Sequence, residues 1–197
     1  MDSSKCNAII LAAGQSQRFG KPKFSLPFDA EKTFLEKIIN EYVSVGCNKI
    51  VVVINPESKP YFQKAHWMQS DHFEIVINPN PEIGRFSSVK TGLAALAEPQ
   101  PTFIQNVDNP FVTDELLQLL LGSLKKHDGV CPAFQKKGGH PLLISASLVT
   151  NLKSAEYGLD FKQYLKEFDI QKPEVTDSKV LANINAAEEY KKWFNTI

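Results

Sequence analysis

A stretch rich in small and basic residues near the N-terminus has the composition of an anion-binding loop. It directly follows a short apolar run, residues 7–11, which predicts a buried strand. Backbone N–H groups can approach an anion closely at Gly14 and Gly20, because glycine has no Cβ. Three basic side chains of the same stretch can add charge-assisted hydrogen bonds: Arg18, Lys21 and Lys23. The pattern predicts a phosphate site.

The spacing within this loop differs from that of two common phosphate-binding motifs. A P-loop places four residues between its first glycine and a Gly-Lys pair, and Ser or Thr follows. Here five residues separate Gly14 from Gly20-Lys21, and Pro22 follows. The dinucleotide fingerprint needs glycines that open a helix, whereas Pro22 and Pro27 disfavour a helix here. The sequence therefore excludes both motifs.

A second candidate for chemistry is the acid Asp108, which follows the apolar segment 102–107 and stands two residues before Pro110. A carboxylate that faces a phosphate-binding loop can hold Mg²⁺, which binds through one or two carboxylates together with phosphate oxygens. Such a metal polarises a bound phosphate group and offsets its negative charge. A structural alternative is an Asp side chain that hydrogen-bonds its own backbone in a turn, which is common before proline.

The elements that must position these residues alternate between strand-like and helical patterns. Strands are predicted at 7–11, 49–54, 73–77, 102–107, 129–134 and 141–144, and helices at 34–43, 87–96, 113–126, 159–168 and 186–194. Such alternation predicts an α/β fold with a mostly parallel, twisted sheet between two helical layers. Ligands of these sheets bind beyond the carboxyl ends of the strands. We therefore expect the N-terminal loop and Asp108 to lie at the same edge.

The bulk composition is that of an ordinary globular chain, which we expect to form one domain over residues 1–197. Basic and acidic residues number 22 each, which argues against nucleic acid or an anionic membrane as a partner. Three cysteines, at positions 6, 47 and 131, have no zinc or redox spacing and are expected to be buried free thiols. The sequence shows neither a signal-like segment nor an apolar run long enough to span a bilayer, so we expect a cytoplasmic protein.

The N-terminal loop resembles a family motif. The pattern L-A-A-G-x-S-x-R-F-G-x-x-K, residues 11–23, is similar to that of the molybdenum-cofactor nucleotidyltransferases, the MobA-like and MocA-like enzymes. The resemblance extends over most of the chain and implies a three-layer, Rossmann-like fold of the nucleotide-diphospho-sugar-transferase type. It implies that Asp108 is the principal Mg²⁺ ligand and that Arg18 and Lys23 neutralise the triphosphate. The implied nucleotide-binding residues of the loop are Leu11, Ala12, Ala13, Gly14, Ser16, Arg18 and Lys23.

Residues 84–93 resemble the family's third element, a glycine followed by a serine-rich helix start. Relatives use this region for the base and ribose, which implies that Ser87 and Ser88 bind nucleotide. Arg85 and Phe86 depart from the family pattern, in which smaller or apolar residues are more usual. The alternative is a surface helix that a serine caps.

Two further segments match the family. Residues 138–144 resemble its Gly-His-Pro element, which implies that His140 borders the acceptor, although a lone histidine is more often structural. Residues 183–190 resemble the segment before the terminal helix, where many relatives carry a metal-binding Asp at the position of Asn185. Asn185 can be a second metal ligand, a helix N-cap, or both.

The resemblance implies that an acceptor phosphate attacks the α-phosphorus of a nucleoside triphosphate and that pyrophosphate leaves. Ala13 stands where guanylyl-transferring relatives have glycine, which favours a pyrimidine and therefore CTP. The acceptor is expected to be a phosphorylated, molybdopterin-type small molecule, and the product implies transient contact with a cofactor-receiving enzyme. Two alternatives are a sugar- or polyol-phosphate nucleotidyltransferase and a non-catalytic nucleotide-binding or cofactor-handling module. Arg85 and Asn185 favour the module.

Overall fold

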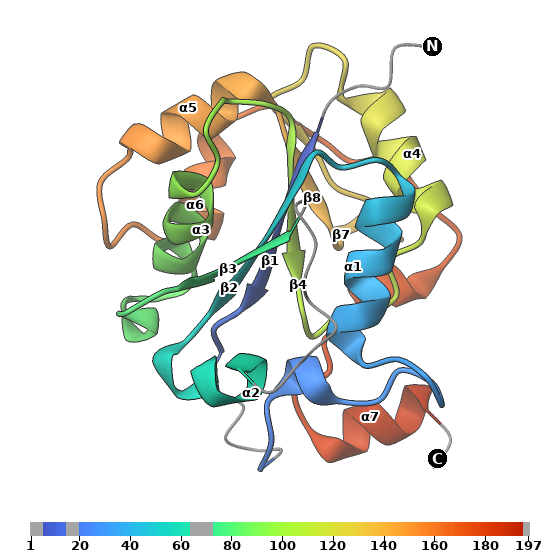
Figure 1. Cartoon of the computed structure of the whole chain (residues 1–197). Helices are drawn as coiled ribbons and strands as arrows, with labels where there is room; N and C mark the ends of the chain where they lie inside the picture. The colour runs from blue at the N-terminus through green and yellow to red at the C-terminus, as the bar shows by residue number, and fades with distance from the viewer. Residues whose placement is uncertain (1–5, 15–19, 64–72, 195–197) are drawn as a thin grey trace.

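A twisted sheet runs through the middle of the molecule. The computed structural model describes residues 6–14, 20–63 and 73–194, and within them seven strands pair in the order β3-β2-β1-β4-β8-β5-β9 (Figure 1). The strands are β1 Asn7–Ala12, β2 Lys49–Ile54, β3 Phe73–Ile77, β4 Thr102–Asn106, β5 Gly129–Val130, β8 Leu142–Ile144 and β9 Ile170–Gln171. A separate hairpin joins β6 (Ala133–Phe134) to β7 (Lys137–Gly138).

The pairing of β1 places the two predicted motifs at the same sheet edge. β1 lies between β2 and β4 and is parallel to both, with Leu11 opposite Val53 and Asn106. The loops that follow β1 and β4 therefore leave the sheet side by side. The predicted, mostly parallel sheet is confirmed, and β8 is its exception, because it runs antiparallel to both β4 and β5.

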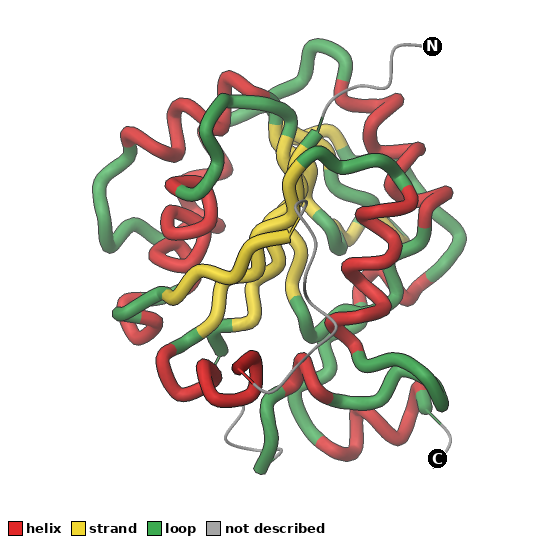
Figure 2. The backbone as a smooth tube through the Cα atoms, in the orientation of Figure 1, coloured by secondary structure: helices red, strands yellow, loops and turns green. Residues whose placement is uncertain are grey.

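Helices cover both faces of the sheet, as Figure 2 shows. In Figure 1, α1 and α4 lie on one side, and α3, α5 and α6 lie on the other. The described helices are α1 Phe34–Ser44, α2 Lys59–Gln63, α3 Arg85–Ala94, α4 Asp114–Leu124, α5 Ala146–Ser154, α6 Phe161–Tyr164 and α7 Ala187–Trp193. This three-layer arrangement confirms the expected fold class. None of the described helices has the length and apolar character needed to cross a bilayer.

Side chains of β1 alternate between two buried clusters. Ile10 packs with the residues of α1 and α4, whereas Ile9 packs with those of α3 and α5. A strand covered on both faces is therefore apolar throughout. Helix α3 lies so close to the sheet that a Cβ on Gly92 would meet Ile9 Cγ2 at 2.5 Å. Only glycine fits at this contact.

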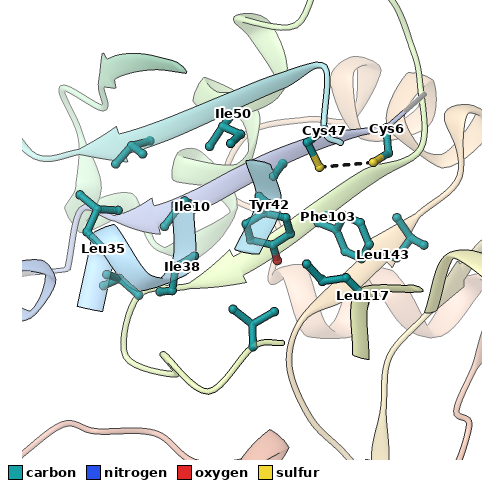
Figure 3. Packing of buried hydrophobic residues seen from close by; sticks show 14 of the residues in the cluster. Cys6, Ile10, Leu35, Ile38, Tyr42, Cys47, Ile50, Phe103, Leu117 and Leu143 are labelled. Atoms are coloured by element: carbon teal, nitrogen blue, oxygen red, sulfur yellow. Dashed lines mark hydrogen bonds between the residues drawn. The ribbon is translucent and has the colours of Figure 1, made fainter. Parts of the chain in front are cut away.

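The first cluster also contains the predicted buried thiols. Cys6 and Cys47 are free and buried, with their sulfur atoms 3.3 Å apart (Figure 3). Tyr42 packs beside them, fully buried, and its hydroxyl donates to Gln105 Oε1 at 3.0 Å. Cys131 is free and buried in the second cluster. The expectation of buried free thiols is confirmed.

Three of the predicted elements differ from the structure. Helix α3 begins at Arg85 with Gly84 at its N-cap, so the predicted start at residue 87 with a serine cap is wrong. Gly84 has φ +115°, which side chains rarely adopt, and the chain turns there before any serine is reached. The predicted strand 129–134 is two short strands, and the predicted helix 159–168 is α6 followed by a 3₁₀ turn, Leu165–Glu167.

Candidate active site

A cavity of about 230 Å³ opens beyond the carboxyl ends of β1 and β4. Residues 11–14 and residues 106–108, which follow two paired strands, both line it. The start of α3 contributes Gly84, Arg85 and Ser88, and Lys23 closes the cavity from the N-terminal loop. A Cβ built on Gly14 would meet no atom of the described residues within 4 Å. The two motifs thus share one cavity, as the sheet topology predicts.

Lys23, Asp108 and Asn185 meet at this cavity although they are far apart in the sequence. Lys23 Nζ donates to Asn185 Oδ1 at 2.5 Å and lies 3.6 Å from Asp108 Oδ2. The backbone holds Asn185 near Asp108, because the N–H of the preceding residue, Ile184, donates to the Asp108 carbonyl at 2.8 Å. The side chains of Lys23 and Asp108 are only 17% and 20% exposed. Their charges are therefore weakly screened by water.

The Asp108 carboxylate is incompletely satisfied. Its Oδ1 atom is buried and has no hydrogen-bond partner within the described ranges. Burial raises the pKa of Asp108 above its usual value, while the positive charges of Lys23 and Arg85 oppose that increase. A buried carboxylate oxygen without a donor beside open space fits a cation ligand, because such an atom otherwise costs free energy.

The turn that presents Asp108 is held by its neighbours, not by Asp108 itself. Asn109 Oδ1 accepts from the Phe111 N–H at 3.3 Å, and its Nδ2 donates to the Lys179 and Val180 carbonyls, each at 3.1 Å. Gln105 Nε2 donates to the Asn109 carbonyl at 2.8 Å. The structural alternative predicts that the side chain of Asp108 closes this turn. In the structure the side chain of Asn109 does so. The sequence pattern did not identify Gln105 and Asn109 as residues of the site. The available signal was a glutamine within an apolar, strand-like segment.

The two serines at the start of α3 point to different surroundings. Ser88 lines the cavity. Ser87 Oγ donates towards the Gly84 carbonyl at 2.8 Å and accepts from Asn78 Nδ2 at 2.8 Å, so it holds the preceding loop against the helix. Of the two predicted nucleotide contacts, the structure brings only Ser88 to the cavity. Arg18 and Ser16 lie outside the described residues.

Asn185 does not cap the terminal helix. Glu189 Oε2 accepts from the backbone N–H groups of Asn185 and Ala186, at 2.5 and 3.0 Å, and so caps the start of α7. The capping interpretation of Asn185 is therefore wrong, because its side-chain oxygen faces Lys23. Aromatic packing holds this segment, since the tilted rings of Phe34 and Phe194 lie 5.4 Å apart between centroids. The C-terminal segment is thus part of the site.

His140 lies beside a second, larger cavity that adjoins the first. Its Nε2 is 3.1 Å from Asn106 Nδ2, and Asn106 lines the first cavity. The other ring nitrogen, Nδ1, is buried and has no hydrogen-bond partner in the described structure. Burial, with Arg85 nearby, lowers the pKa of His140 to about 4. The ring is therefore neutral near pH 7 and supplies no positive charge.

Comparison with known proteins identifies the family. The model of the MobA-like NTP transferase domain matches residues 8–170. The chain belongs to this family. It is 23% identical to molybdenum cofactor cytidylyltransferase of Escherichia coli, over 95% of this chain and 94% of that protein. It is 27% identical to molybdenum cofactor guanylyltransferase of Sinorhizobium fredii, over 72% of this chain and 63% of that protein.

Solved structures show the same fold. The manganese complex of Rv0371C from Mycobacterium tuberculosis has a TM-score of 0.76 and 15% identity, and the match covers 98% of this chain and 100% of that one. The MobA-like chain is thus a nucleotidyltransferase by family. Within its described residues, no three His, Cys, Asp or Glu side chains form a metal-binding group.

Proposed function

We propose that this MobA-like protein transfers CMP from CTP to the phosphate of a molybdopterin-type acceptor, and that Asp108 is the residue that would hold a Mg²⁺ ion for this reaction. One observation carries the proposal. Asp108, whose carboxylate oxygen Oδ1 has no hydrogen-bond partner within the described residues, lines one cavity together with Lys23 and Gly14. These are the groups needed to bind a metal and a triphosphate together.

Each residue has a separate task in this reaction. Lys23, held in place by Asn185, binds the phosphates, and backbone N–H groups of residues 13–14 approach them from the other side. An acceptor phosphate oxygen forms a bond to the α-phosphorus, the bond from that phosphorus to the β-phosphate oxygen breaks, and pyrophosphate leaves with the electron pair. An ionised phosphate needs no strong base, which agrees with the neutral His140 at this edge.

Asp108 is the residue that would hold the metal. When bound, Mg²⁺ would polarise the α-phosphate and offset the charge on the leaving pyrophosphate. Asn185 Oδ1 is a second oxygen within reach of the same cavity edge, and its amide can coordinate Mg²⁺ without adding charge. The manganese in the Rv0371C structure supports a divalent ion in this fold, since Mn²⁺ and Mg²⁺ both favour oxygen ligands.

The choice of CTP depends on Ala13, which lines the cavity next to Gly14 and stands where guanylyl-transferring relatives have glycine. The cytidylyltransferase of E. coli also aligns over more of this chain than the S. fredii guanylyltransferase does. A panel of CTP, GTP, ATP and UTP with Mg²⁺ tests this choice by thermal shift. A nucleotide at about 100 times its Kd stabilises the folded state by about 2.7 kcal/mol, which raises Tm by roughly 5–10 °C in a domain of this size.

Lys23→Ala tests the phosphate contact. We expect CTP binding to weaken about 100-fold and the thermal shift to shrink accordingly, because a poorly screened ion pair is lost. Lys59→Ala, an exposed lysine on α2, is the matched control and should keep the full shift. An unchanged shift in Lys23→Ala would remove Lys23 from the site. Strong CTP binding without pyrophosphate release from any phosphorylated acceptor would favour the non-catalytic module.

A further inference from the structure

Two cysteines that are far apart in the sequence meet at the amino edge of the sheet. Cys6 directly precedes β1, Cys47 stands two residues before β2, and the two strands pair in parallel from their first residues onward. Their sulfur atoms lie 3.3 Å apart inside the first buried cluster (Figure 3). The two positions are 41 residues apart, and this separation matches no redox motif. The fold alone creates this thiol pair, Cys6 and Cys47.

Backbone hydrogen bonds hold both cysteines of the thiol pair in place. The Cys47 N–H donates to the Tyr42 carbonyl at 3.0 Å, and the Asn48 N–H donates to the Cys6 carbonyl at 2.8 Å. The S–S distance of a disulfide is about 2.05 Å, so the two sulfur atoms need to approach each other by only about 1.2 Å. Side-chain rotation can supply a change of this size while the backbone contacts stay intact.

The surroundings of the thiol pair favour a neutral oxidation product. The pair packs in an apolar cluster that also contains Tyr42, Ile50 and Phe103. A sulfinate or a sulfonate at this place would bring a negative charge into the core, and burying a charge costs free energy. A disulfide carries no charge and has no hydrogen-bond donor to satisfy. Disulfide formation is therefore the oxidation that this core accommodates.

The two thiols of the pair differ in reactivity. The hydrogen bond with Cys47 lowers the pKa of Cys6, whereas that bond and burial raise the pKa of Cys47. Because the thiolate is the nucleophile, Cys6 is the thiol that reacts first and Cys47 the one that resolves the product. Cys131 lies in the second cluster, away from the other two cysteines of the chain, and burial raises its pKa. It is an internal comparison without a neighbouring thiol.

The position of the thiol pair limits the oxidant that can reach it. Cys6 is 0% and Cys47 is 5% exposed, so a bulky reagent has no direct access. Asn7 and Asn48, the residues that follow the two cysteines, line a cavity of about 300 Å³ at this edge. The first cavity lies beyond the opposite, carboxyl ends of the strands. A small, neutral peroxide is the class of oxidant that suits this location.

We propose that Cys6 and Cys47 are a redox site, which a peroxide converts into a reversible disulfide between the amino ends of β1 and β2. The Cys6 thiolate attacks one oxygen of hydrogen peroxide, an S–O bond forms, the O–O bond breaks, and the leaving hydroxide becomes water with the proton that Cys6 lost. Cys47 then attacks the Cys6 sulfur, the S–S bond forms, the S–O bond breaks, and the second hydroxide leaves as water with the Cys47 proton. The two sulfur atoms lose two electrons in total, which reduce one peroxide to two water molecules.

The expected consequence is a more stable folded state. The disulfide would close residues 6–47 into a loop and so reduce the freedom of the unfolded chain. We expect the oxidised protein to melt roughly 5–15 °C above the reduced protein. Dithiothreitol should return the melting temperature to that of the reduced form, because thiol exchange opens the bond again.

Treatment of the folded chain with hydrogen peroxide, followed by alkylation and peptide mass mapping, tests the bond. The peptides of Cys6 and Cys47 should be joined, with the loss of two hydrogen atoms and without a cross-link at Cys131. Cys131→Ser is the matched control, which should keep both the cross-link and the rise in melting temperature. Cys47→Ala should lose both. Each variant is compared with its own reduced form, so that an effect of the substitution on stability does not enter the result.

Four results would each overturn the proposal. They are thiols that persist at Cys6 and Cys47 while Cys131 is oxidised, a cross-link between two copies of the chain, a cross-link that forms only in urea, and an oxidised protein that melts at or below the reduced one. If Cys47→Ala does not fold, the native chain and Cys131→Ser still decide among these results. None of them depends on nucleotide transfer, so the redox site and the proposed reaction can fail separately.

Discussion

Replacing Asp108 with asparagine should change catalysis and the folding stability of the protein in opposite directions. Lys23 Nζ lies 3.6 Å from Asp108 Oδ2, and at an effective dielectric constant of about 20 their attraction is about 5 kcal/mol. The pKa of Asp108 is nevertheless raised, because burial outweighs the two nearby cations. The ionised carboxylate therefore costs folding free energy at neutral pH in the absence of metal. Asparagine has the same shape without the charge.

The pH dependence has a definite sign. A carboxyl whose folded-state pKa is raised binds its proton more tightly in the native protein than in the unfolded chain. Its stabilising contribution is present below the unfolded pKa, about 3.9, and is lost as pH rises through the folded value. At pH 8, ligand-free Asp108→Asn should thus melt at the same temperature as the native protein or above it. Each 1 kcal/mol regained raises Tm by roughly 2–4 °C in a domain of this size.

Catalysis should change in the opposite direction. Loss of the proposed metal ligand would remove several kcal/mol of transition-state stabilisation, so pyrophosphate release with Mg²⁺ should fall at least about 1,000-fold. Mg²⁺ should also stop adding to the thermal shift that CTP produces. Glu98→Gln, an exposed acid outside the first cavity, is the control for removing a negative charge. A variant that keeps Mg²⁺-dependent turnover, or that melts well below the native protein when ligand-free, would refute this reasoning.

Two further substitutions test the surroundings of the site. Asn185→Asp adds a carboxylate beside Lys23, so the Mg²⁺ concentration for half-maximal activity should fall several-fold; an unchanged value would limit Asn185 to anchoring Lys23. Lys90 is 8% exposed and donates to the Leu152, Lys153 and Ala155 carbonyls at the end of α5. Lys90→Met should therefore lower the free energy of unfolding by about 2 kcal/mol, measured by urea denaturation, because buried carbonyls lose their donor; a change within error would mean that water replaces the ammonium.

The sequence predicts the fold best where the elements are long and periodic. α1 carries buried residues at helical spacing, and β2 is apolar at nearly every position, so their bounds are almost those of the patterns. The segment from Gly129 to Ile144 is different, since its strands have only two or three residues and such lengths carry no period. The start of α3 was misplaced for another reason. It depends on a positive φ at Gly84, a backbone property that the serine pattern conceals.

The site was predictable as a meeting of two loops but not in its finer roles. The parallel order of β1 and β4 requires their loops to share an edge. Composition alone could not distinguish Asp108 from Asn109 as the residue that closes the turn, because both types favour turns. The distinction depends on Gln105, Lys179 and Val180, which hold Asn109 and leave the Asp108 carboxylate towards the cavity.

Net charge misleads at the scale of a single cavity. A sum of zero over the chain argues against long-range attraction of a polyanion, since opposite charges cancel at a distance. Within roughly 8–10 Å, the screening length in physiological salt, only the local charges count. Arg85 and Lys172 both line the second cavity, the one beside His140, although they are 87 positions apart in the sequence. No acidic residue of the described chain lines this cavity. The fold can therefore gather basic residues around one cavity although the net charge of the chain is zero.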